Sequence, residues 1–132
     1  MSNIIGTIQK LPNLLPLKAA SSIEITDAEL QLRVGFSSEY KDYLANFGAI
    51  MADGIELTGI TKSEYRNVVF VTKQEWELNV NVPHTMYVIE NTGIDGIVIW
   101  QNTDGCIYKT QPSSKPQRIA SSLNEYIVER SK

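Results

Sequence analysis

One apolar stripe that ends at a glycine constrains the fold of this chain more than any other feature. Its side chains recur at i, i+3, i+4 and i+7, the spacing that places them on one face of a helix. Gly48 follows directly, and glycine readily takes the left-handed conformation in which many helices end. The spacing therefore predicts a helix that ends at Gly48 and packs this face into the core. The stripe consists of Tyr40, Tyr43, Leu44 and Phe47.

The sequence on either side of the stripe predicts how the chain enters and leaves this helix. Thr26 and Glu29 have the spacing of a capping box, in which each side chain accepts a hydrogen bond from a free N–H of the first turn. An earlier helix should therefore start at Thr26. After Gly48, residues 50–60 contain two glycines and the alternating run Ile55–Thr58, which is typical of strands. We expect the chain to pass from helix directly into sheet.

The pattern of the N-terminal segment predicts its secondary structure less clearly than the rest of the sequence does. Residues 1–24 are poorly determined by their pattern, although Ile4, Ile5 and Ile8 could line one face of a short helix. Pro12 would end that helix, because proline lacks the N–H that a continuing helix needs. The apolar residues that follow Pro12 are typical of a packed connection.

Helix and strand signals compete in the middle of the chain. Residues 62–67 are typical of a loop. The β-branched content of Val68–Val71 favours a strand, whereas Thr72 and Glu75 have the spacing of a second capping box. We expect a helix over about Lys73–Val80, and Val68–Val71 stays open between the two alternatives.

The pattern changes to sheet after Pro83. Three apolar segments are separated by two short turns rich in Asn, Asp and Gly, and such turns join neighbouring antiparallel strands. A third capping box, formed by Ser122 and Glu125, predicts a terminal helix to about Glu129. Helices followed by a meander and a last helix indicate an α+β fold. The three segments are 86–90, 96–101 and 106–109.

Length and composition bound the class of protein. A chain of 132 residues has the size of one domain, so we treat 1–132 as a single domain. Its 42% hydrophobic and 20% charged residues are typical of a soluble protein, and no apolar run reaches the roughly 18 residues that span a bilayer. The first ten residues lack the basic and apolar regions of a secretory signal. We expect a cytoplasmic protein, a location that the lone Cys106 also suits.

The charge balance argues against nucleic-acid binding. The formal net charge is −3 and the pI is about 5.1. Binding to phosphates requires clustered Lys and Arg, and the sequence has no such cluster. A mild acidic excess keeps a cytosolic protein soluble, and it also suits a basic partner through complementary fields. The oligomeric state stays open.

The sequence offers little material for catalysis. His84 is the single histidine, and it follows Pro83 in a predicted loop with no residue that would orient its ring. Cys106 begins a strand after a tight turn, where a free cysteine is usually a small buried apolar residue. A dyad of Cys106 and His84 would form only if the meander brought them together. We therefore expect no enzyme and no cofactor.

Carboxylates gather in or beside the predicted turns. Aspartates favour turns because they accept hydrogen bonds from backbone N–H groups nearby, and this preference needs no function. Alternatively, the turns bring the carboxylates to one edge of the sheet, where they would meet a basic partner. Their spacing does not match a calcium-binding loop, so no metal is expected. The four residues are Asp53, Glu56, Asp95 and Asp104.

Two tryptophans are the largest side chains of the chain. Trp100 shares a strand face with Val98, and Trp76 lies in the first turns of the predicted helix. Core positions are favoured for both, and the alternative is that they anchor an interface, where tryptophan is enriched.

The order of these motifs resembles the SUKH superfamily, which includes the fungal Smi and Knr cell-wall regulators and many bacterial immunity proteins. The similarity covers about residues 25–130. Two positions depart from the family pattern: Ser38 stands where a proline is usual, and Ala49 replaces a second glycine after Gly48. The matching segments are 26–30, 38–44, 46–49, 54–57 with Gly59, 67–69 with Thr72, 95–96, 104–105 and 121–123.

The resemblance implies a mixed, mainly antiparallel sheet flanked by helices. It also implies that the chain binds and neutralises a cognate protein toxin, such as a nuclease or deaminase domain, without catalysis. A second hypothesis is a regulatory scaffold or small-ligand module of the same fold, and a third is a hydrolase that uses Cys106 and His84. The candidate residues for partner binding are Asp53, Glu56, Trp76, Asp95, Trp100 and Asp104.

Overall fold

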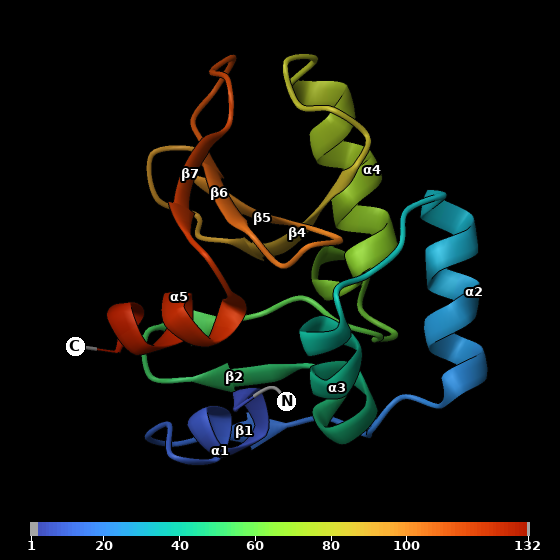
Figure 1. Cartoon of the computed structure of the whole chain (residues 1–132), viewed down its shortest axis with the longest axis vertical. Coiled ribbons are helices and arrows are strands. Elements are labelled where there is room, and N and C mark those ends of the chain that lie inside the picture. Colours follow the sequence, from blue (N-terminus) through green and yellow to red (C-terminus); the bar gives the residue numbers. More distant parts are fainter. Residues whose placement is uncertain (1–2, 132) are drawn as a thin grey trace.

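Five α-helices and two antiparallel sheets build the fold within residues 3–131, the part of the chain that this computed structural model describes (Figure 1). The α+β class is therefore confirmed. The elements in chain order are α1 (Ile4–Gln9), β1 (Leu15–Pro16), α2 (Ser22–Leu32), α3 (Ser38–Phe47), β2 (Ile50–Ala52), β3 (Ile55–Glu56), the 3-10 helix η1 (Glu64–Arg66), α4 (Val68–Leu78), β4 (Met86–Asn91), β5 (Val98–Asn102), β6 (Ile107–Thr110), β7 (Gln117–Ala120) and α5 (Leu123–Arg130).

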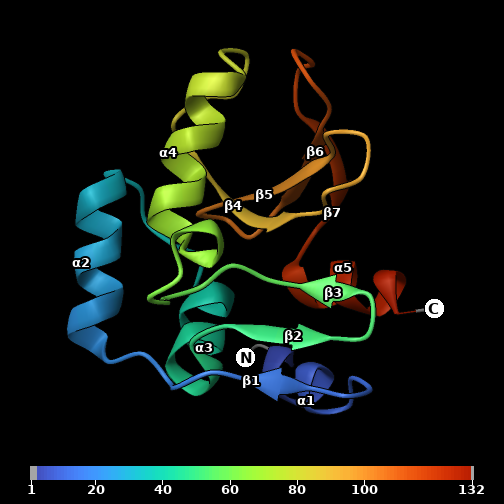
Figure 2. The ribbon, with the colours of Figure 1, turned by 180° about the vertical axis from the view of Figure 1, so that it is seen from behind.

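The two sheets lie at different ends of the molecule. The small sheet has the order β1-β2-β3, and the larger one is a meander of order β4-β5-β6-β7. Figure 2 shows the small sheet with α1 at one end and the meander with α4 at the other. Thr58 joins them, because its N–H donates to the Ile89 carbonyl and its hydroxyl donates to the Val88 carbonyl.

Helix α3 follows the prediction from the apolar stripe. Ser37 caps its first turn by accepting a hydrogen bond from the Tyr40 N–H at 3.0 Å. The helix ends at Gly48, whose φ is +70°. A Cβ atom at this position would lie 2.0 Å from the Lys18 carbonyl oxygen, so glycine is required for space as well as for conformation.

Helix α2 begins one turn earlier than predicted, so the assignment of Thr26 as its cap is wrong. Ser21 is the N-cap, and it forms a capping box with Glu24. The sequence has the same spacing twice, and the second glutamate is used elsewhere: Glu29 accepts from the Phe36 N–H and pairs with Lys41. Hydrogen bonds from Ser21 lower the pKa of the Glu24 carboxyl group.

Helix α4 also begins earlier than predicted. Asn67 caps it by accepting from the N–H groups of Val69 and Phe70, so Val68–Val71 is helical and the expected start at Lys73 is wrong. Thr72 is fully buried inside the helix, where its hydroxyl accepts from the Val88 N–H. The threonine that resembled a cap therefore ties α4 to β4.

The C-terminal part of the fold confirms the predicted helix and three predicted strands, and it adds a strand that was not predicted. Ser122 caps α5 as predicted by accepting from the Glu125 N–H, although the Glu125 carboxylate accepts from Ser121. The three predicted strands correspond to β4, β5 and β6. Strand β7, which follows a loop rich in Ser and Pro, was not predicted.

A cluster of aromatic rings forms the centre of the core. Neighbouring ring centroids in this cluster are 4.7 to 5.4 Å apart. The phenol groups are hydrogen-bonded: Tyr40 to the Thr58 hydroxyl, Tyr43 to the Thr58 carbonyl and Tyr87 to Gln101. Burial raises the pKa of all three phenols well above the ordinary value of 10.0. The rings belong to Phe36, Tyr40, Tyr43 and Tyr87.

Candidate partner-binding surface

A buried carboxylate joins α3, β5 and α5. Glu39 is 8% exposed, and its oxygens accept from the N–H groups of Leu123 and Asn124 at 2.7 and 2.8 Å. The Gln101 side chain donates to the same carboxylate at 3.1 Å. Glu39 therefore acts as an internal cap for α5, because a carboxylate is stabilised by the free N–H groups at a helix start.

A polar groove of about 720 Å³ lies above this network, between the starts of α3 and α5. Among the residues predicted from sequence, Asp104 lies on its wall. Ser38 and Asp42 of α3 and Asn124 of α5 are further lining residues. Because Glu39 and Gln101 are satisfied within the protein, the polar groups that the groove offers to a ligand are hydroxyl, amide and carboxylate groups of its other lining residues.

The acidic turn residues do not meet at one edge of the sheet. Asp95 lies in the turn before β5 and Asp104 in the turn after it, so they are at opposite ends of the same strand. Asp53 lies in the β2–β3 turn, where it accepts a hydrogen bond from Asn13. Glu56 lies on β3 and pairs with Arg66 at 3.6 Å. These carboxylates are therefore distributed over the molecule.

Both tryptophans belong to the core, as the favoured interpretation held, so neither presents an exposed anchor. Trp100 is 0% exposed, and its indole N–H donates to the Thr110 hydroxyl at 2.9 Å. Trp76 is 8% exposed, and its indole N–H donates to the Met86 carbonyl at 3.1 Å. The sequence could not decide this point for Trp100, because strand alternation does not say which face of a sheet is covered.

His84 and Cys106 have structural contacts of their own. The His84 ring stacks on Trp76 with 4.1 Å between ring centroids. The Cys106 N–H donates to the Asn102 side chain. No hydrogen bond between Cys106 and His84 is found within residues 3–131, and the described histidine, cysteine and carboxylate side chains form no metal-binding group of three or more.

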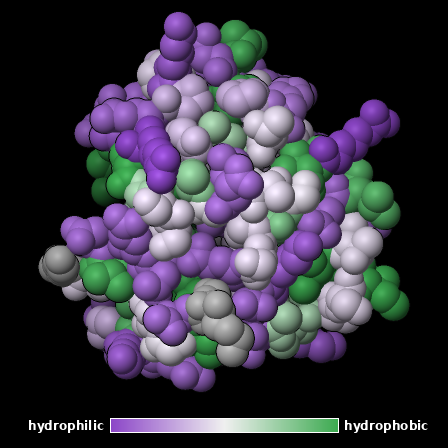
Figure 3. All heavy atoms as spheres, viewed as in Figure 1, coloured by the Kyte–Doolittle hydropathy of each residue, from purple (hydrophilic) through white to green (hydrophobic). Residues whose placement is uncertain are grey.

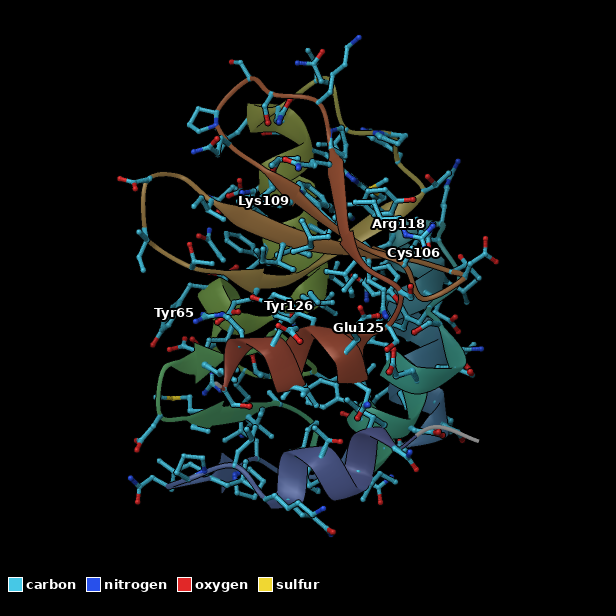
Figure 4. All side chains as sticks on the ribbon, turned by 60° about the vertical axis from the view of Figure 1, so that its left-hand side comes forward. Tyr65, Cys106, Lys109, Arg118, Glu125 and Tyr126 are labelled. Carbon is cyan, nitrogen blue, oxygen red and sulfur yellow. The ribbon has the colours of Figure 1, made fainter. Side chains whose placement is uncertain are left out.

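A second buried carboxylate holds the C-terminal helix against the meander. Glu90 is 2% exposed and accepts from the Tyr126 hydroxyl at 2.5 Å and from Arg130 at 2.8 Å. It also accepts from the Glu56 N–H. Burial and the adjacent Glu90 carboxylate raise the pKa of the Tyr126 phenol well above its ordinary value. Figure 4 shows Tyr126 and Glu125 on α5, next to the four-stranded sheet.

The surface that sequence reasoning missed lies on α2. Ile23 and Leu30 are 80% and 70% exposed. Hydrophobic side chains accordingly gather along the edge of the molecule that α2 occupies (Figure 3). The opposite face of the helix is buried and carries Ile25, Ala28 and Leu32. The sequence contains one indication of this surface, because residues 22–32 carry two apolar stripes on one helix. The expected start at Thr26 left Ile23 outside the helix, so the second stripe was not recognised.

A groove of about 450 Å³ separates α2 from the start of α4. On the α2 side it is lined by Glu24, Asp27 and Gln31. Phe70 of α4, which is 40% exposed, lies on the other wall. The exposed apolar face of α2 therefore borders a concave surface that also contains an exposed aromatic ring.

None of the helices within residues 3–131 combines the length and apolar character required to cross a bilayer.

Comparison with known proteins assigns the chain to a family. A comparison with curated proteins gave no match. The family model SUKH_5, described as SMI1-KNR4 cell-wall, matches residues 1–131. Because this match covers nearly the whole chain, the protein belongs to the SUKH superfamily, in its SMI1-KNR4 family.

Proposed function

We propose that this chain is an immunity or antitoxin-type protein, which binds a cognate protein toxin and neutralises it without catalysis. Members of the family are generally known as immunity proteins, and the family is not known as a family of enzymes. Neutralisation would take place in the cytoplasm, where a nuclease or deaminase toxin domain reaches its substrate.

The observation that carries this proposal is the use of the buried polar groups. Enzymes need acid, base or nucleophilic groups aimed at a substrate. Here Glu39 and Glu90, the most buried carboxylates, accept hydrogen bonds that hold α5 in place. His84 is stacked on Trp76. These groups build a rigid scaffold, and a preformed scaffold favours tight binding because little conformational entropy is lost on association.

The exposed acidic turns would assist the encounter with a basic toxin. Asp53, Asp95 and Asp104 are exposed, and Glu56 is about half exposed. Since they are distributed over the molecule, they would add to a general acidic field that speeds association rather than form one contact patch. Trp76 and Trp100 would contribute through the stability of the core.

Co-expression tests the proposed function. The chain is expressed together with the toxin domain encoded by the gene next to its own, and cell growth is compared with cells that express the toxin alone. Restored growth, and binding of the two purified proteins at micromolar concentration or tighter, are expected. Growth arrest despite expression of the folded chain would contradict the proposal.

A second candidate function rests on the polar groove between α3 and α5. Its volume of about 720 Å³ is within the range of small-molecule sites. A regulatory scaffold or small-ligand module would use this groove without a toxin. Thermal-shift measurements with a metabolite panel distinguish the two, because a rise in melting temperature on ligand addition would favour this candidate.

A further inference from the structure

The outer face of α2 is an apolar surface that no described element covers. Helical geometry places Ile23 and Leu30 almost in line, two turns apart, and diametrically opposite the buried stripe of Ile25, Ala28 and Leu32. A surface helix normally has one apolar face, and its other face is polar. Exposed apolar surface of this kind marks interaction sites.

Acidic side chains border this apolar face. Residues 22–32 contain three carboxylates and no Lys or Arg. Glu29 is engaged by Lys41 and by the Phe36 N–H. Glu24 accepts a hydrogen bond from Ser21 and also interacts electrostatically with Lys18, whereas Asp27 accepts from Gln31. Both carboxylates stay exposed. Both line the α2–α4 groove, whose lining outside α2 includes Lys62, Glu64 and Lys73. Within residues 22–32, no basic residue of the helix itself offsets these carboxylates.

The charge pattern decides what covers this face. In a symmetric dimer the same surface patch meets itself, so the carboxylates of Glu24 and Asp27 would approach their own copies. Like charges at an interface are unfavourable. A partner with apolar side chains and a Lys- or Arg-rich rim would instead match both the anchors and the charges.

We propose that α2 is the docking helix for the toxin, with Ile23 and Leu30 as apolar anchors and Glu24 and Asp27 facing a basic rim on the partner. This inference rests on the proposed function. It fits a toxin domain that acts on nucleic acid, because such a domain needs clustered Lys and Arg to bind phosphates. Toxin docked on α2 would leave the polar groove between α3 and α5 free.

The test uses the full chain and the toxin domain of the neighbouring gene. The double variant Ile23→Gln, Leu30→Gln keeps helix-forming side chains at exposed positions, so it folds. We expect its Kd for the toxin to be at least about 30-fold higher, the loss typical of two central anchors. Leu78→Gln with Val80→Gln is the matched control, because these residues are 69% and 88% exposed and lie outside α2. It should bind like the wild type.

A charge variant tests the rim. Asp27→Lys is expected to lower the association rate and to weaken its dependence on salt, whereas Glu77→Lys, an equal charge change on the exposed side of α4, should change both much less.

The outcomes separate this inference from the proposed function. A wild-type chain that neither binds nor neutralises the toxin overturns both. A wild-type chain that neutralises the toxin, with a double α2 variant that binds within about threefold of it, overturns the docking helix alone. Sedimentation that shows a wild-type dimer and a monomeric double variant would assign this face to a second copy and would also overturn it.

Discussion

Two consecutive helices of this protein differ in how much of their apolar surface the fold covers. Helix α3 buries one face of aromatic and aliphatic residues, together with Glu39, and exposes polar residues or alanine elsewhere. Helix α2 also buries one apolar face, against α3 and α4, but it presents a second apolar face to solvent. The comparison shows that the fold covers the apolar face of α3, whereas it leaves the second apolar face of α2 open to a binding partner.

Alkaline pH should have the largest effect on stability, through buried tyrosines of α3, β4 and α5. The pKa values of Tyr40, Tyr43, Tyr87 and Tyr126 are raised by burial, so the folded state retains protons that the unfolded chain releases above pH about 10. The contribution of each tyrosine to the free energy of unfolding is therefore fully present below that pH. Above it, the free energy of unfolding should fall by about 1.4 kcal/mol per pH unit for each tyrosine. Urea unfolding and tyrosinate absorbance measured against pH check this expectation. Tyrosinate signals that rise fully before unfolding would contradict it.

Loss of the buried carboxylate of α3 should have the next largest effect. Glu39→Ala leaves the N–H groups of Leu123 and Asn124 and the Gln101 amide without their acceptor, so we expect the free energy of unfolding to fall by about 3 kcal/mol. Chemical unfolding of purified protein measures it. Asp42→Ala, on the exposed side of the same helix, is the control and should cost less than about 0.5 kcal/mol. Equal effects of the two would mean that Glu39 does not cap α5.

The start of α2 is testable by a pair of substitutions. Ser21→Ala removes the N-cap and should destabilise the protein by about 1 kcal/mol. Thr26→Ala, at the position that the sequence pattern favoured, should be neutral or slightly stabilising, because Thr26 is exposed within the helix and alanine has the higher helix propensity. Thermal unfolding of both variants decides between the two starts.

The smallest effect on stability is expected on the outer face of α2. Ile23→Gln with Leu30→Gln should change the free energy of unfolding by less than about 0.5 kcal/mol, since both side chains are already exposed. Leu32→Ala on the buried face should cost about 3 kcal/mol. A large destabilisation by the double variant would mean that the outer face supports the fold, and the contrast between α2 and α3 would disappear.

Local patterns identified several elements correctly for a clear physical reason. The helix that ends at Gly48, the three strands that became β4 to β6 and the cap at Ser122 depend on residues close in sequence. Local patterns failed where two copies of one pattern competed. Ser21 and Thr26 are both followed by a glutamate three residues later, and the choice of Ser21 depends on Glu29 being bonded to Phe36 and Lys41.

The candidate site was less accessible to sequence reasoning than the fold. The six residues chosen from sequence were acidic turn residues and large aromatic residues, which are general features of binding surfaces. The structure buries Trp76 and Trp100, and it places Asp95 and Asp104 at opposite ends of β5. The exposed Ile23 and Leu30 form a second apolar stripe only when the helix starts at Ser22, and spacing alone does not say which of the two stripes a neighbour covers.

The sequence by itself determined the α+β class, the family, the end of α3 and the order of strands β4 to β6, because spacing and turn residues act over a few positions. Only the tertiary structure decided where α2 and α4 begin, that Glu39 caps a helix more than eighty residues away, and which face of α2 stays open. Each of these depends on contacts between elements distant in the chain. Burial is a property of the neighbours that a residue has in space, and a linear pattern does not contain them.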